Sequence, residues 1–255
     1  MTNAKRAIRA AVSLAAFSLL TLAAIGAIQL LFFGGGNKNS APASTTPRPT
    51  VVIDAGHGGM DGGCVSASSS GTGAGTTGAE GARILEKDCN LSISKKLAAL
   101  FRVSGYNVVM TRETDVMLDG EGLAGGAKMR DLRARLDIAS RYPDAIFISI
   151  HCNKFPSAEC KGLQVYYSPN HPYSKEAAQA VQTSAVTLLQ PDNKRLPKQA
   201  DSSIFLLNRA TQPAILIECG FLSNPEEAQS LADGEYQKKL ALSILLPLIT
   251  EADKT

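Results

Sequence analysis

The stretch TVVIDAGHGGMDGG, residues 50–63, decides the fold class of this chain. Its first six residues form a β-branched and apolar run of strand length, which is typical of a strand buried in a parallel sheet. A glycine-rich turn follows, and His57 lies inside it. The turn matches neither of the two common glycine-rich phosphate-binding patterns. We therefore interpret it as a sharp turn that leaves space for a ligand beside the imidazole.

Strand and helix patterns alternate along the rest of the chain. After the first strand, runs of strand type occupy residues 106–112, 145–150, 162–168, 203–208 and 214–219, and helical patterns occupy residues 86–104, 129–143, 175–190, 223–231 and 235–250. Asn224, Pro225 and Glu227 have the spacing of a helix N-cap, a first-turn proline and a capping box. The alternation predicts an α/β fold, with a mostly parallel sheet and helices on both faces.

Composition narrows the class of function. The chain has 255 residues, a net charge of +3 and no tryptophan, which gives no electrostatic case for nucleic-acid binding. Its five cysteines form no CxxC pair, so neither a zinc ribbon nor a thioredoxin-type motif is available. We expect free thiols.

The N-terminus predicts a membrane anchor. Residues 10–33 carry no charge over 24 positions, enough for a helix to cross a hydrocarbon core about 30 Å thick. Lys5, Arg6 and Arg9 precede this run, which places the rest of the chain on the extracytoplasmic side. A cleaved signal peptide, followed by secretion, is the alternative. With an anchor, residues 1–33 form a short cytoplasmic segment and the membrane helix. Residues 34–49 form a flexible linker, and residues 50–255 form one catalytic domain.

Three of the predicted strands end in an ionisable side chain. His57, His151 and Glu218 each follow an apolar run, and the carboxyl ends of parallel strands meet at one edge of a sheet. Two histidines and one carboxylate can form a catalytic zinc site with water as the fourth ligand. Glu86, at the start of a predicted helix, is our candidate for the carboxylate, with Asp88 and Glu80 as competitors.

Glu218 is then left to move protons. The end of an apolar strand desolvates its carboxyl group and raises the pKa, which suits a general base near neutral pH. The alternative is a structural glutamate paired with Arg112. Cys152 and Cys219 each follow a site residue, and neighbouring residues in a strand point to opposite faces, so we exclude both as ligands.

The motifs VVIDAGHGGMDGG, LEKDCNLSISKKL, VVMTRETD, LRARLDIA, IFISIHCN and ILIECGFLSNPEE occur in this order. Together they resemble the zinc-dependent N-acetylmuramoyl-L-alanine amidases of the type-3 amidase family, over residues 51–250. The resemblance implies a mixed six-stranded sheet flanked by helices. It also implies Zn²⁺ ligation by His57, Glu86 and His151 and a catalytic role for Glu218.

The resemblance further implies hydrolysis of the amide between the lactyl group of N-acetylmuramic acid and L-alanine in peptidoglycan. Arg112 and Asn153 are candidate substrate contacts. A zinc peptidase of similar fold and a non-catalytic peptidoglycan-binding protein are the alternatives. An anchor, a tether and one catalytic domain resemble the amidase type that acts on spore cortex.

Two features depart from the family pattern. A Gly/Ser/Thr-rich insertion occupies residues 64–83, between the first two proposed ligands, and its role is open. No helix of the kind that occludes regulated amidases is evident between His151 and Glu218. We therefore expect an open cleft that needs no activator protein.

Overall fold

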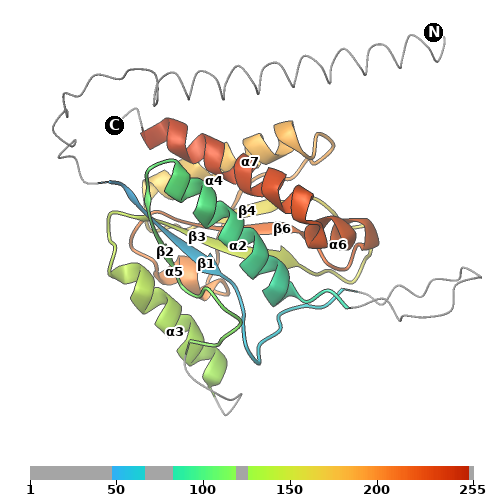
Figure 1. Cartoon of the computed structure of the whole chain (residues 1–255), viewed down its shortest axis with the longest axis horizontal. Helices are drawn as coiled ribbons and strands as arrows, with labels where there is room; N and C mark the ends of the chain where they lie inside the picture. Colours follow the sequence, from blue (N-terminus) through green and yellow to red (C-terminus); the bar gives the residue numbers. More distant parts are fainter. Residues whose placement is uncertain (1–47, 67–82, 119–125, 253–255) are drawn as a thin grey trace, which may run out of the picture. The chain divides into compact units, whose positions relative to one another are not determined.

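A six-stranded sheet lies at the centre of the computed structural model, which describes residues 48–66, 83–118 and 126–252 (Figure 1). The strands are β1 (Thr50–Ala55), β2 (Asn107–Met110), β3 (Ile146–Asn153), β4 (Gln164–Tyr167), β5 (Lys198–Gln199) and β6 (Ala214–Phe221). Their order is β2-β1-β3-β6-β4-β5, and only the β4–β6 pairing is antiparallel. The predicted mixed, mostly parallel sheet is confirmed.

Helices cover both faces of the sheet, as predicted. One face carries α2 (Glu86–Val103), α4 (Pro172–Leu188), α6 (Pro225–Ala232) and α7 (Gly234–Ala252), and the other carries α3 (Ala127–Ser140) and α5 (Phe205–Arg209). The two layers enclose separate apolar cores. The larger core lies under α2, α4 and α7, and the smaller one lies under α3 and α5.

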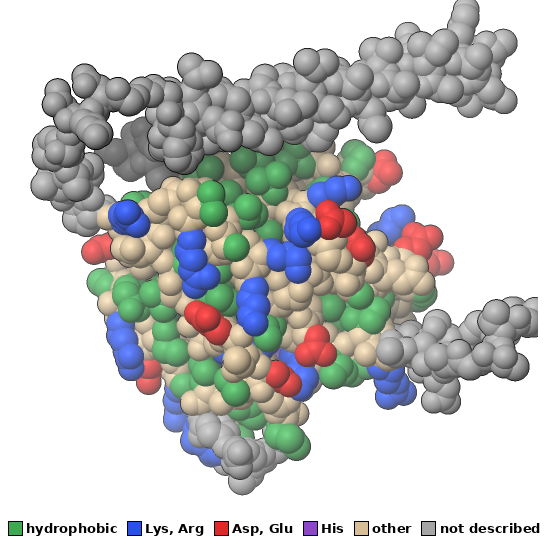
Figure 2. All heavy atoms as spheres, in the orientation of Figure 1, with side chains coloured by type: hydrophobic (Ala, Val, Ile, Leu, Met, Phe, Trp, Pro, Cys, Tyr) green, Lys and Arg blue, Asp and Glu red, His purple; other side chains and the backbone are tan. Residues whose placement is uncertain are grey.

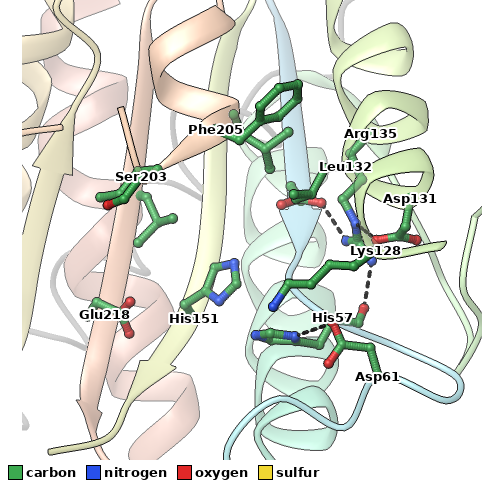
Figure 3. A pocket seen from close by; sticks show the side chains of 15 residues that line it. His57, Asp61, Lys128, Asp131, Leu132, Arg135, His151, Ser203, Phe205 and Glu218 are labelled. Atoms are coloured by element: carbon green, nitrogen blue, oxygen red, sulfur yellow. Dashed lines mark hydrogen bonds and ion pairs between the residues drawn. The ribbon is translucent and has the colours of Figure 1, made fainter. Parts of the chain in front are cut away.

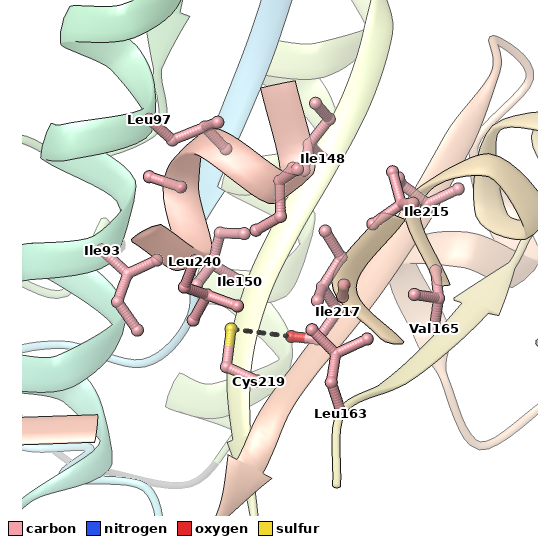
Figure 4. Close-up of a cluster of buried hydrophobic side chains, with 14 of the residues drawn as sticks. Ile93, Leu97, Ile148, Ile150, Leu163, Val165, Ile215, Ile217, Cys219 and Leu240 are labelled. Atoms are coloured by element: carbon pink, nitrogen blue, oxygen red, sulfur yellow. Dashed lines mark hydrogen bonds between the residues drawn. The ribbon is translucent and has the colours of Figure 1, made fainter. Parts of the chain in front are cut away.

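The alternation of side chains along β3 and β6 separates structural from functional residues. Cys152 and Cys219 belong to the larger core, where Figure 4 shows Cys219 beside apolar side chains. His151 and Glu218 precede them by one residue and therefore project from the opposite face, toward α3 and α5. All five cysteines are free, as expected from their spacing.

Two local predictions were wrong. Residues 203–208 were expected to form a strand, but they contain the start of α5, whose Leu206 and Leu207 pack into the smaller core. The edge strand is instead β5, two exposed residues that pair with β4. Asn224 does cap α6, but the Glu227 carboxylate accepts hydrogen bonds from the backbone N–H groups of Phe221 and Gly162. The reciprocal half of the capping box is absent.

The predicted anchor at 10–33, nearly all of the linker at 34–49 and most of the insertion at 64–83 lie outside the described residues. Among the residues that are described, no helix has the length and apolar character needed to cross a membrane. On the face drawn in Figure 2, basic and acidic side chains are interspersed, in keeping with the small net charge.

Candidate metal centre

The three predicted metal ligands meet at the carboxyl end of β1 and β3. His57 lies in the turn after β1, His151 lies near the end of β3, and Glu86 is the first residue of α2. Their candidate ligand atoms all lie within 4.8 Å of one another. Glu86 Oε1 is 3.2 Å from His57 Nε2 and 3.0 Å from His151 Nδ1. Of the three carboxylates considered from sequence, the structure brings Glu86 to the histidines.

Glycines make room for the two imidazoles. A Cβ atom at Gly56 would lie 2.3 Å from two ring atoms of His151, and one at Gly63 would lie 2.8 Å from His57 Cδ2. His57 itself has a φ of 61°, a left-handed conformation that costs a non-glycine residue about 1–3 kcal/mol. The residue with this unfavourable backbone conformation is thus the same residue that supplies the first candidate ligand.

Glu86 is fixed by the backbone around it. Its Oε2 accepts a hydrogen bond from the Cys64 N–H at 2.7 Å, and its Oε1 accepts one from the Cys152 N–H at 3.2 Å. Burial opposes ionisation of Glu86, but the two histidines outweigh it and lower the pKa well below its usual range. Glu86 is thus held as a carboxylate, the form that binds metal ions.

Asp61 orients the first ligand. Its Oδ2 lies 2.8 Å from His57 Nδ1, so this carboxylate directs His57 Nε2 toward Glu86. Such carboxylate–histidine pairs fix the tautomer of a metal-binding imidazole. Burial lowers the pKa of His57, but Asp61 and Glu86 outweigh burial and raise it to about 9. The sequence prediction missed Asp61, although its position four residues after His57 was a usable signal.

Glu218 lies beside the ligands with a free oxygen. It is the register partner of His151 across the β3–β6 pairing, and its buried Oε2 has no hydrogen-bond partner. Burial raises the pKa of Glu218 to about 7, and the Glu86 carboxylate adds to this effect against the opposing influence of His151 and His57. A carboxyl group with this pKa can both take up and release a proton near neutral pH.

A pocket of about 220 Å³ opens onto these residues from the α3 and α5 side (Figure 3). His57, His151 and Glu218 line one part of it. Helix α3 contributes Lys128 and Leu132, while the segment at the start of α5 contributes a hydroxyl and apolar side chains. The pocket thus offers a cationic group and an apolar wall next to the candidate metal ligands.

Two of the three separations between candidate ligand atoms fit a tetrahedral metal ion. Two ligands that each lie about 2.0–2.1 Å from such an ion are separated by roughly 3.3 Å. The observed separations from Glu86 Oε1, 3.2 Å to His57 Nε2 and 3.0 Å to His151 Nδ1, are close to this value. The unpartnered Glu218 Oε2 adds an acceptor beside the ligand cluster. Two imidazoles, one carboxylate and a position left for water are the donor set of catalytic zinc sites.

The two candidate substrate contacts lie outside the pocket lining. Arg112 is buried, with 3% of its surface exposed, and donates four hydrogen bonds to backbone carbonyl groups. It forms no ion pair with Glu218, so the alternative that coupled these two residues is wrong. The Asn153 Oδ1 accepts a hydrogen bond from the Lys154 N–H. A substrate contact by either residue stays a prediction.

Comparison with known proteins agrees with this geometry. The sequence profile of the family described as N-acetylmuramoyl-L-alanine amidase matches residues 51–249. The germination-specific N-acetylmuramoyl-L-alanine amidase of Bacillus subtilis is 34% identical over 196 residues, which cover 76% of each chain.

Solved structures show the same fold. The CwlD amidase from Clostridioides difficile, determined in complex with the GerS lipoprotein, has a TM-score of 0.71 and 33% identity, over 82% of this chain and 100% of that one. An N-acetylmuramoyl-L-alanine amidase from Clostridium difficile 630 has a TM-score of 0.63 and 30% identity, again over 82% of this chain and 100% of the other.

Proposed function

The chain belongs to the N-acetylmuramoyl-L-alanine amidase family and acts on peptidoglycan, and we propose that it does so as a zinc enzyme through His57, Glu86, His151 and Glu218. One observation carries the proposal: the three ligand atoms lie within mutual reach, beside a buried glutamate oxygen without a partner. The bond cleaved is the amide between the lactyl group of N-acetylmuramic acid and L-alanine.

Each side chain then has a distinct part in hydrolysis. Bound zinc supplies a Lewis acid that polarises the scissile carbonyl and lowers the pKa of water. Glu218 takes a proton from the attacking water and returns it to the departing nitrogen of L-alanine, which its pKa of about 7 permits. Asp61 holds His57 in the ligating tautomer, and the pocket beside α3 and α5 receives the substrate.

We propose a role in remodelling the cell wall or the spore cortex, with the catalytic domain outside the cytoplasmic membrane. The similarity to the germination-specific amidase supports the cortex role. The charge-free run at 10–33 after three basic residues supports a membrane anchor, or a cleaved signal followed by secretion.

We also propose that the cleft works without an activator. The relative from Clostridioides difficile was solved in complex with a lipoprotein, so activation by a partner of that kind is the alternative that the test has to exclude. In this chain, however, the pocket is open to the candidate metal ligands. Purified protein should therefore cleave peptidoglycan without any added partner protein. Activity that appears only after a partner is added would contradict the proposal.

The test of the catalytic assignment is Glu218→Gln. We expect the rate of peptidoglycan cleavage to fall about 10²- to 10⁴-fold, because the general base is lost, while bound zinc stays at the wild-type level. His151→Ala should lose zinc as well as activity. Glu226→Gln, on the exposed surface of α6, is the matched control and should behave as wild type. Cleavage by Glu218→Gln at the wild-type rate would show that another group moves the proton.

A further inference from the structure

Two buried arginines converge on the turn that carries the first metal ligand. Arg112 follows β2, and Arg135 lies on α3, with 3% and 1% of their surfaces exposed. Neither is among the residues to which the proposed chemistry gives a role. Burying a guanidinium group is costly unless hydrogen bonds and opposite charges compensate it, so their contacts indicate a function.

The two guanidinium groups bind three consecutive carbonyl groups, one at the end of β1 and two in the turn that follows it. Arg112 donates from Nε to the Ala55 carbonyl at 2.9 Å and from Nη2 to the Gly56 carbonyl at 3.0 Å. Arg135 donates from Nη1 to the same Ala55 carbonyl and from Nη2 to the His57 carbonyl, both at 2.7 Å. The backbone on which the His57 imidazole is mounted is thus held from two sides.

Arg112 also joins the turn to the second ligand. Its Nη2 donates to the Lys87 carbonyl at 2.8 Å, and Lys87 directly follows Glu86 in the first turn of α2. One guanidinium group therefore spans the segment that carries His57 and the segment that carries Glu86. The separation of these two segments is fixed by a rigid planar group.

Arg135 is itself anchored by charge. Its Nη1 lies 2.8 Å from Asp54 Oδ1, and its Nε lies 2.7 Å from Asp131 Oδ2, with all three side chains buried. Asp54 is the second-to-last residue of β1, three residues before His57, and Asp131 lies one turn before Arg135 on α3. The Arg135 guanidinium group, which donates to the His57 carbonyl, is thereby fixed to the central sheet.

We propose that Arg112 and Arg135 are positioning residues that set the distance between the His57 and Glu86 ligand atoms, and through it the affinity for the metal. The inference rests on the metal site proposed above. The need for such a device follows from the local sequence, because the glycines that make room for the imidazoles also leave the turn free to adopt other conformations. Lysine cannot replace either residue, since its single ammonium group lacks the planar fork that reaches several carbonyl groups at once.

Arg112→Lys and Arg135→Lys test the proposal, because both keep the charge and lose the fork. Zinc affinity of the full chain is measured by competition with a chelator, and the melting temperature of the metal-free protein is measured beside it. We expect the zinc dissociation constant to rise about 10- to 100-fold, the range seen when groups that support metal ligands are removed. Arg102→Lys, an exposed arginine at the end of α2, is the matched control and should bind zinc as wild type does.

A purely structural role would lower the melting temperature and leave the zinc affinity of the folded protein unchanged. That result for Arg112→Lys would overturn the proposal. If Arg135→Lys does not fold, the zinc affinity of Arg112→Lys is sufficient to test the positioning role. Wild-type protein that fails to bind zinc would refute the metal site itself, together with this inference. If the wild-type protein binds zinc and Arg112→Lys binds it with the same affinity, the positioning role is refuted and the metal site is not.

Discussion

Gly56→Ala should separate metal binding from folding, because the three atoms nearest to the added methyl group all belong to the ring of the metal ligand His151. The new Cβ would lie 2.3 Å from Cε1 and Nε2 of His151, whereas ordinary contact begins at 3.4 Å. The ring therefore has to move by about 1.1 Å, the difference between these distances. The φ of Gly56 lies outside the left-handed region, so alanine fits the backbone and the clash is the cause of any effect.

A shift of this size is large for a metal site. Ligand distances hold within about 0.2 Å, and misplacing a group by about 1 Å can cost 100-fold in rate. We expect kcat/KM to fall at least about 100-fold, or about 2.7 kcal/mol of transition-state stabilisation. Zinc affinity should weaken with it. Crowding of this kind also destabilises the fold by about 1–3 kcal/mol, which leaves room for the protein to remain folded.

The assay compares Gly56→Ala with Gly62→Ala, an identical change in the same turn. A Cβ atom at Gly62 has no neighbour within 4 Å, so this control should keep wild-type activity and zinc affinity. Turnover of a soluble muropeptide, chelator competition and melting temperature are measured for both. If Gly56→Ala binds zinc and turns over like the control, the glycine does not serve to make room for His151, and our explanation of the turn is wrong.

Two further predictions concern the groups behind the ligands. Asp61→Asn should weaken zinc binding about 10- to 100-fold in chelator competition, because the neutral amide fixes the His57 tautomer less well; unchanged affinity would show that Asp61 has no such role. Burial raises the pKa of Asp54, but the Arg135 guanidinium and other partners outweigh burial and leave it lowered. This carboxylate therefore stabilises the fold above its ordinary pKa of 3.8, and the stabilisation is lost as pH falls through the lowered value. Asp54→Asn should reduce the free energy of unfolding by about 3–5 kcal/mol at pH 7 in denaturant titrations, and by less below pH 4; a pH-independent difference would contradict the ion pair.

The parts of the site that sequence could predict are those attached to strand ends. His57, His151 and Glu218 follow apolar runs, and parallel strands deliver their carboxyl ends to a common edge. Glu86 was harder, because a carboxylate in the first turn of a helix is also stabilised by the helix dipole alone. In the structure, the Glu86 carboxylate accepts hydrogen bonds from the backbone N–H groups of Cys64 and Cys152, which mark it as part of the site. No local sequence pattern reveals these contacts.

The failures have physical causes as well. A six-residue apolar run such as 203–208 is too short to show a period of 2 or 3.6, so its partners in the smaller core decide its conformation. Strand β5 is two exposed residues long and exists through its pairing with β4. Arg112 was interpreted from its place after a strand, but its role depends on the Gly56 and Lys87 carbonyls, 56 and 25 residues away.

The most direct test of the central claim is the mass of the products that zinc-loaded wild-type protein releases from purified disaccharide-peptide units of peptidoglycan. We predict two products: a disaccharide with a free lactyl carboxylate, and an intact stem peptide with L-alanine at its amino terminus. Free amino acids, or shortened peptides still attached to muramic acid, would identify a zinc peptidase instead. No cleavage by protein that holds its zinc would contradict the catalytic site described here.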